Sequence, residues 1–344
     1  MPSCLLSIEF SRPDRHYLGG EKVSGWIRVE VERNVRCRSL HLAARWTTSG
    51  KTDVASGVYH RTSLFEGVWK PGERYEYSFE FESPVGPFTY RGKNFELDHC
   101  VSVWADLPWT IETRQEAVFE VLPDPAGNQR KAIETPLPDP LTRSRPARFR
   151  TPGFELLMAS FVLLASALLV IPFGAWALIG AFAAMMIGLC SLRHALPRAA
   201  LPDRRWDFPL FLAPGLPCPI HVDTGRVRWT RIRSIEVVLS GHERTWSGNR
   251  EKREHHDTTL AREAFVMELN TLDNESASGT LRGDLTVPVP DTVAWSIDLP
   301  GARVVWEFHT RVRFAWWPDL IECHEVAMIP RGHYLGPAAA ENVR

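Results

Sequence analysis

Apolar and polar residues alternate with a period of two through most of the first third of the chain. Val23–Val31 and Tyr75–Phe81 alternate in this way, which predicts strands with one buried and one solvent-facing side. Turn signals such as Lys70–Glu73, which contains Pro-Gly, separate these runs. Several short strands at this spacing predict an antiparallel β-sandwich over residues 1–123.

The same alternation returns later, in Arg231–Leu239 and in Val304–Phe314, and predicts a second sandwich over residues 207–330. Between these runs, His242–Glu263 is highly charged and is expected to contain a long surface loop. The tail at 331–344 is rich in Gly, Ala and Pro and is expected to fray.

The two β parts share weakly similar segments in the same order. Arg36–Leu42 parallels Arg231–Val237, and Val101–Trp109 parallels Val312–Leu320. Each part then ends in a strand that runs into a proline, at Pro123 or at Pro330. This shared order predicts two tandem sandwiches.

An uncharged apolar block separates the two β parts. It runs from Leu156 to Leu192 and is interrupted at Pro172–Gly174. A transmembrane helix needs about 20 apolar residues, so the block is too long for one helix and suits two. We therefore expect a transmembrane helical hairpin at 153–192, between a Pro/Arg-rich linker at 124–152 and a basic linker at 193–206. A re-entrant hairpin also fits, because the first helix is short.

Basic residues flank the apolar block on both sides, which predicts two spans with both β parts in the cytoplasm. These residues are Arg143, Arg145, Arg148, Arg150, Arg193, Arg198, Arg204 and Arg205. They either fix the topology alone or also hold the sandwiches against anionic lipid. Small residues in the second helix allow close packing within the hairpin or against another protein. They are Ala177, Gly180, Ala181, Ala184 and Gly188.

Composition narrows the function classes. The 344 residues carry a net charge of -1, which argues against a nucleic-acid partner because phosphate binding needs a basic field. The six cysteines are scattered without a CxxC motif, so neither a disulfide framework nor a Cys-rich zinc site is indicated. No GxSxG, P-loop or GxGxxG motif is present, and no catalytic residue or cofactor is predicted.

Several segments together resemble the arrestin-like superfamily. In the first part they are Tyr17, the Gly19–Glu21 turn and the Val23–Ile27 strand, and later Pro71-Gly72 followed by Phe79–Phe81. In the second part they are Gly279–Pro288 and Trp295. The resemblance implies a mainly β fold of two immunoglobulin-like, arrestin-like sandwiches. It also implies a non-enzymatic adaptor that binds partners through sandwich edges and loops.

The chain departs from that family in three ways. A hairpin is predicted between the sandwiches, no PPxY motif is present, and the family's phosphate-sensing basic residues have no counterpart that we can place. Recognition of phosphorylated receptors is therefore not carried over.

Two groups of side chains are candidates for binding. His255, His256 and Asp257, with Glu254 beside them and His242 nearby, could ligate a metal, but a charged surface loop explains them better, so no metal is predicted. Trp104, Trp109, Trp316 and Trp317 either pack in the cores or contact a partner or lipid headgroups.

The sequence therefore predicts a membrane-anchored scaffold, adaptor or accessory subunit. Its partners would be membrane lipids and a membrane protein complex or a second copy of the chain. One alternative is an oligomeric transport or channel component, although the hairpin lacks the internal ionisable residues that mark ion paths. The other is a metal-dependent enzyme that uses His255 and His256.

Overall fold

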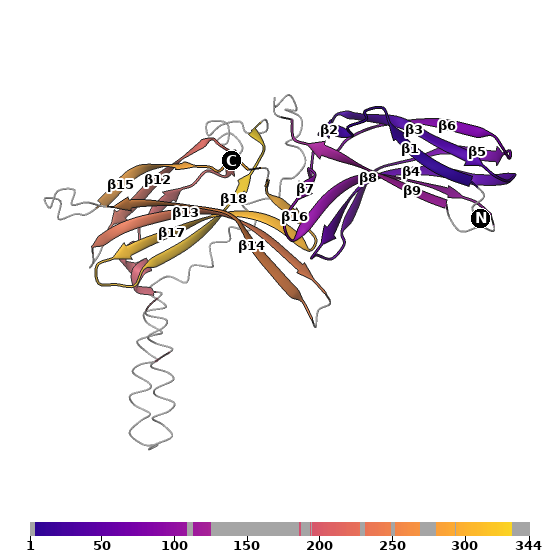
Figure 1. Cartoon of the computed structure of the whole chain (residues 1–344). Helices are drawn as coiled ribbons and strands as arrows, with labels where there is room; N and C mark the ends of the chain where they lie inside the picture. Colours follow the sequence, from indigo (N-terminus) through magenta and orange to yellow (C-terminus); the bar gives the residue numbers. More distant parts are fainter. Residues whose placement is uncertain are drawn as a thin grey trace, which may run out of the picture.

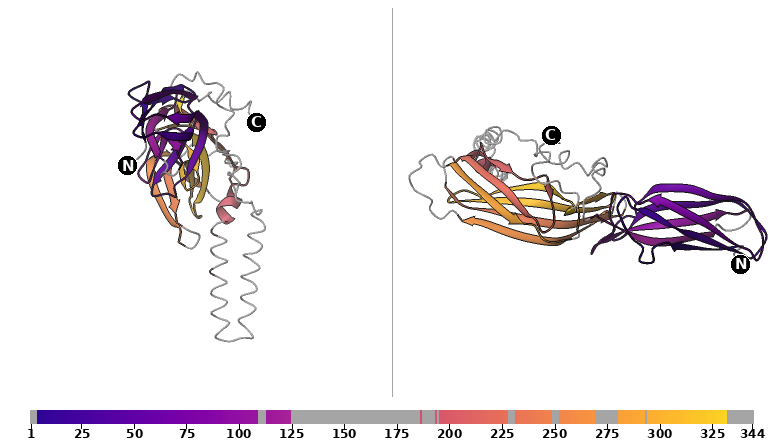
Figure 2. Two further views of the ribbon diagram at one scale, coloured as in Figure 1. Left: turned by 90° about the vertical axis from the view of Figure 1, so that its right-hand side faces the viewer. Right: turned by 90° about the horizontal axis from the view of Figure 1, so that it is seen from above.

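The computed structural model describes residues 4–108, 113–124, 186, 193, 195–227, 231–248, 252–268, 280–292 and 294–331. These residues form two β domains that lie end to end (Figures 1 and 2). The first domain contains β1 (Cys4–Phe10), β2 (His16–Leu18), β3 (Lys22–Val31), β4 (Val35–Gly50), β5 (Ser56–Trp69), β6 (Arg74–Glu82), β7 (Tyr90–Arg91), β8 (Phe95–Asp106) and β9 (Thr113–Leu122).

The first domain is a sandwich of two sheets. One has the strand order β1-β3-β6 and the other β2-β9-β8-β4-β5, with β7 paired to β8. Strand β3 alternates between buried and exposed positions, as its sequence predicts. Its buried residues Val23, Ile27 and Val29 share one apolar core with Leu40 and Phe119 of the facing sheet.

The second domain contains β10 (Arg205–Asp207), β11 (Phe211–Leu212), β12 (Pro217–Arg226), β13 (Ile232–Ser247), β14 (Glu254–Glu268), β15 (Thr280–Pro288), β16 (Ile297–Leu299), β17 (Ala302–Phe314) and β18 (Leu320–Met328). Its sheets have the orders β10-β12-β15 and β11-β18-β17-β13-β14, with β16 paired to β17. Each strand of the second domain thus takes the place of the first-domain strand whose number is lower by nine, so that β10 corresponds to β1 and β18 to β9. The tandem arrangement expected from the shared segments is found in this repeated topology.

The charged stretch His242–Glu263 is mostly strand rather than a long loop. Strands β13 and β14 pair from Ser234 opposite Glu268 to Ser247 opposite Glu254. The expectation of a long loop was wrong because the charged residues alternate across the outer edge of a sheet, where one side chain in two faces solvent.

The mainly β fold with two sheet-rich domains is confirmed, whereas the membrane topology is corrected. Within the described part of the chain, no helix is long and apolar enough to cross a membrane. The buried apolar residues described there form the cores of the two sandwiches. The prediction of a two-span protein with both β parts in the cytoplasm is therefore wrong. Apart from Met186, the stretch at 153–192, with Ala177, Gly180, Ala181, Ala184 and Gly188, lies outside the described residues.

Candidate functional site

A buried glutamate joins the two domains. Glu243 of β13 is completely buried, and its carboxylate accepts hydrogen bonds from three successive backbone N–H groups of the first domain. These are the amides of Lys93 at 2.9 Å, Asn94 at 2.8 Å and Phe95 at 2.9 Å. Successive amides around one carboxylate neutralise a charge that would otherwise be costly to bury. Tyr90 also lies against this carboxylate, and burial, followed by the negative charge of Glu243, raises the pKa of Tyr90.

Apolar packing surrounds this joint. Tyr90, Phe95 and Leu97 belong to the first domain by sequence, but their side chains lie in the core of the second. Polar contacts continue along the boundary, because Asn94 Nδ2 donates to Thr258 Oγ1 at 2.8 Å and Thr52 Oγ1 donates to the carbonyl of Gly301 at 2.7 Å. The joint therefore combines apolar packing with several hydrogen bonds between the domains, which together hold the sandwiches against each other.

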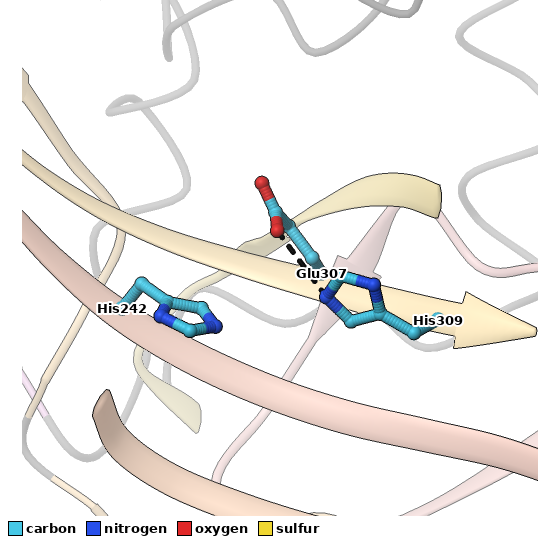
Figure 3. A group of neighbouring side chains, drawn as sticks. All are labelled: His242, Glu307 and His309. Carbon is cyan, nitrogen blue, oxygen red and sulfur yellow. Dashed lines mark ion pairs between the residues drawn. The ribbon is translucent and has the colours of Figure 1, made fainter. Parts of the chain in front are cut away.

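A second cluster lies on the outer face of the six-stranded sheet of the second domain. His242 comes from β13, while Glu307 and His309 come from the neighbouring β17 and share a face because they are two residues apart. One ligand atom from each lies within 4.8 Å of the other two (Figure 3). Glu307 Oε2 and His309 Nε2 are 3.4 Å apart.

Charged neighbours keep the Glu307 carboxylate of this cluster ionised. Arg244 donates to both carboxylate oxygens of Glu307, at 2.9 and 3.1 Å, and to Asp257 Oδ2 at 3.2 Å. Burial opposes ionisation of Glu307, but the hydrogen bonds and charge of Arg244 outweigh it and hold the pKa of Glu307 below its usual value. Asp257 Oδ1 also lies 3.1 Å from His242 Nδ1. The cluster thus offers an ionised carboxylate between two imidazoles.

The histidines singled out from the sequence do not form such a group. His255 and His256 are consecutive on β14, opposite Trp246 and Thr245, so their side chains point to opposite faces of the sheet. Of the predicted set, the structure brings together Asp257 with His242 at 3.1 Å and His256 with Glu254 at 3.9 Å, in two separate pairs. Glu307 and His309 were missed because strand alternation places them on one face but does not reveal which strand lies alongside.

The predicted tryptophans have different environments. Trp316, in the turn between β17 and β18, is 85% exposed, whereas Trp317 beside it packs against the core of the second domain. Trp104 is half-buried on β8 of the first domain, with its ring centroid 5.1 Å from the His41 ring. Trp109 lies outside the described residues. The three described tryptophans do not form one cluster, because Trp104 lies in a different domain from Trp316 and Trp317.

The basic residues expected to flank a membrane also differ among themselves. The Arg204 side chain is only 11% exposed and donates through Nε to both oxygens of Glu322 at 3.1 Å. Trp206 Nε1 donates to the same carboxylate at 2.6 Å. Arg204 therefore stabilises the second domain. Arg193 and Arg205 are exposed and Arg198 is half-buried, while Arg143, Arg145, Arg148 and Arg150 lie outside the described residues.

Comparisons with known proteins point to the same fold. No family model matches the chain. The thioredoxin-interacting protein of Homo sapiens is 29% identical over 135 residues, covering 33% of this chain and 34% of that protein. The protein of the same name from Mus musculus is 29% identical over 136 residues, with the same coverage. The structure of Spo0M, a sporulation control protein from Bacillus subtilis, matches over 83% of this chain and 91% of that chain, at 12% identity and a TM-score of 0.31.

The class of protein follows from the fold and the sequence similarity together. The similarity to thioredoxin-interacting proteins supports an arrestin-like fold, in agreement with the two β domains. The chain spans only 34% of the length of the curated relatives it matches. What those relatives bind therefore bears on this chain only as a proposal.

Proposed function

We propose that this chain is a non-enzymatic adaptor that binds protein partners on a frame of two β-sandwiches. The similarity to thioredoxin-interacting proteins, whose name states that they bind thioredoxin, supports a protein partner and makes a thioredoxin the first candidate. The joint at Glu243 supports a frame with a constant distance between the surfaces of the two domains.

The exposed hairpin between β17 and β18 carries the proposal of a partner contact. Trp316 in its turn is 85% exposed, and Ile321 on β18 is 64% exposed. Tryptophan is enriched among the few residues that dominate binding energy at protein interfaces. Trp317 supplies the packing contact with the domain core, so Trp316 is free to contact a partner. We assign Trp316 as the anchor of the adaptor surface.

Affinity purification tests this proposal. The full chain is used to capture proteins from the cells that make it, and the captured proteins are identified by mass spectrometry alongside direct titration with a thioredoxin. We expect one protein partner, with Trp316→Ala weakening its binding by about 30-fold, equivalent to about 2 kcal/mol at a central interface residue. Trp26→Ala is the matched control, because Trp26 is also exposed (43%) but lies on β3 of the first domain.

The outcomes separate the parts of the proposal. A partner that binds wild type and Trp316→Ala equally would remove Trp316 from the contact surface. A partner other than thioredoxin would keep the adaptor role and discard thioredoxin. Measurable turnover of a small molecule by the purified chain would overturn the non-enzymatic assignment.

A further inference from the structure

We propose that His242, Glu307 and His309 form a binding site for a divalent transition-metal ion, with zinc as the best fit. Two imidazole nitrogens and one carboxylate oxygen are a ligand set that zinc accepts, with a fourth position left for another donor. The three side chains stand on adjacent central strands, so the sheet backbone holds their positions. This site does not depend on the proposed adaptor role.

The distances suit a tetrahedral ion. Zinc–nitrogen and zinc–oxygen bonds of about 2.0–2.2 Å place neighbouring ligand atoms about 3.4 Å apart. Glu307 Oε2 and His309 Nε2 are already 3.4 Å apart. All three ligand atoms lie within 4.8 Å of one another, so rotation of the His242 side chain closes the remaining gap. Figure 3 shows the His242 and His309 rings on either side of Glu307.

Neighbouring charged side chains orient the three ligand residues. Asp257 Oδ1 lies 3.1 Å from His242 Nδ1 and accepts a hydrogen bond from it, so Nε2 is the nitrogen that would bind a metal, in place of its present contact with Ser240 Oγ at 3.2 Å. Carboxylate partners of this kind orient metal-binding histidines and raise their basicity. Arg244 occupies one lone pair on each oxygen of Glu307, whereas an ionised carboxylate offers about four acceptor positions. Glu307 can therefore bind a metal while Arg244 keeps it oriented.

Exposure and the fourth ligand complete the site. The side chain of Glu307 is 11% exposed and forms the floor, while His242 at 20% and His309 at 39% leave a path from solvent. Cys323 of β18 is directly opposite His309 in the sheet register and its thiol is hydrogen-bonded to Glu307. Its sulfur does not lie within 4.8 Å of all three ligand atoms, so it would serve as the fourth ligand only after its side chain turns toward the ion.

Metal titration of the untagged full chain tests the site. After treatment with a chelator, the protein is titrated with Zn²⁺ against a chromogenic competitor, and with Co²⁺ to record visible spectra. We expect one ion per chain and a tetrahedral cobalt spectrum with a sulfur-to-cobalt band that Cys323→Ser abolishes. His242→Ala and His309→Ala should each weaken zinc binding at least 100-fold. Asp257→Asn should weaken it by about 10–100-fold, because Asp257 orients the His242 ring.

Matched variants keep the test decisive. His221→Ala removes a histidine that also pairs with a carboxylate, Asp284, at 2.7 Å but lies on β12 of the other sheet, and it should bind zinc as wild type does. Circular dichroism of the metal-free variants checks that they fold. The proposal is overturned if the wild type binds no zinc, or if folded His242→Ala and His309→Ala variants bind it as tightly as wild type. A wild-type cobalt spectrum without the sulfur band removes Cys323 from the site.

Discussion

Replacing Glu243 with glutamine should loosen the joint between the two domains without removing either core. The carboxylate accepts from the amides of Lys93, Asn94 and Phe95 and is completely buried. A glutamine has one oxygen, so it can still accept from Asn94 and Phe95, which both donate to Oε1. Its amino group then faces the N–H of Lys93, which donates to Oε2 in the wild type.

The size of the effect follows from these contacts. A hydrogen bond to a charged group contributes about 1.5–3 kcal/mol, and one to a neutral group about 0.5–1.5 kcal/mol. Losing one charged bond and weakening two others is partly offset, because a neutral amide is easier to bury than a carboxylate. We expect the Glu243→Gln joint to be weaker by about 2 kcal/mol. That is about a 30-fold rise in the population of the opened joint.

Amide hydrogen exchange measures this opening directly. Exchange at Lys93, Asn94 and Phe95 should accelerate by about 30-fold in Glu243→Gln, while exchange in the central part of β3 stays unchanged. Glu236→Gln is the matched control, because Glu236 lies on the same strand but pairs with Arg313 away from the joint. Wild-type exchange rates at these three amides in Glu243→Gln would refute the role given to the carboxylate.

Two further predictions concern stability. Burial lowers the pKa of His99 to about 4. Between about pH 6.5 and 4 the unfolded chain therefore protonates this histidine while the folded chain does not. The free energy of unfolding should fall by about 3 kcal/mol as the pH drops through that window. Urea unfolding at pH 7 and pH 4.5 should show this loss, and His99→Gln should make it smaller; an equal loss in both proteins would contradict the assignment to His99. Arg204→Gln leaves the Glu322 carboxylate, whose side chain is 14% exposed, without its ion-pair partner and should lower the free energy of unfolding by about 3 kcal/mol in chemical denaturation. Arg205→Gln, at the exposed neighbouring position, should change the free energy of unfolding little. Equal stability of the two variants would contradict the stabilising role of Arg204.

Local pattern was enough to predict the sandwiches but not the sites. The alternation in Val23–Val31 and Val304–Phe314 reports which side of a strand is buried, because side chains alternate across a sheet. It gives no information on strand neighbours. The pairing of β13 with β17 brings His242 near His309, which lies 67 positions along the chain, and no motif marks that distance.

Charge was also a poor guide to exposure. Glu243 and Arg204 are charged residues that the sequence places on the surface or beside a membrane, yet Glu243 is completely buried and the Arg204 side chain is only 11% exposed. Each is held by partners that only the folded chain provides. These partners are three amides from the other domain for Glu243, and Glu322 from a distant strand for Arg204.

If the two sandwiches serve as one binding frame for a protein partner, the full chain carries that partner in the cells that make it. The complex is purified from those cells under mild conditions, its components are identified by mass spectrometry and its mass is measured by light scattering. We expect a stable complex with a second protein in fixed ratio, weakened in Trp316→Ala and retained in Trp26→Ala. Recovery of the wild-type chain alone would show that the chain does not act as such a frame.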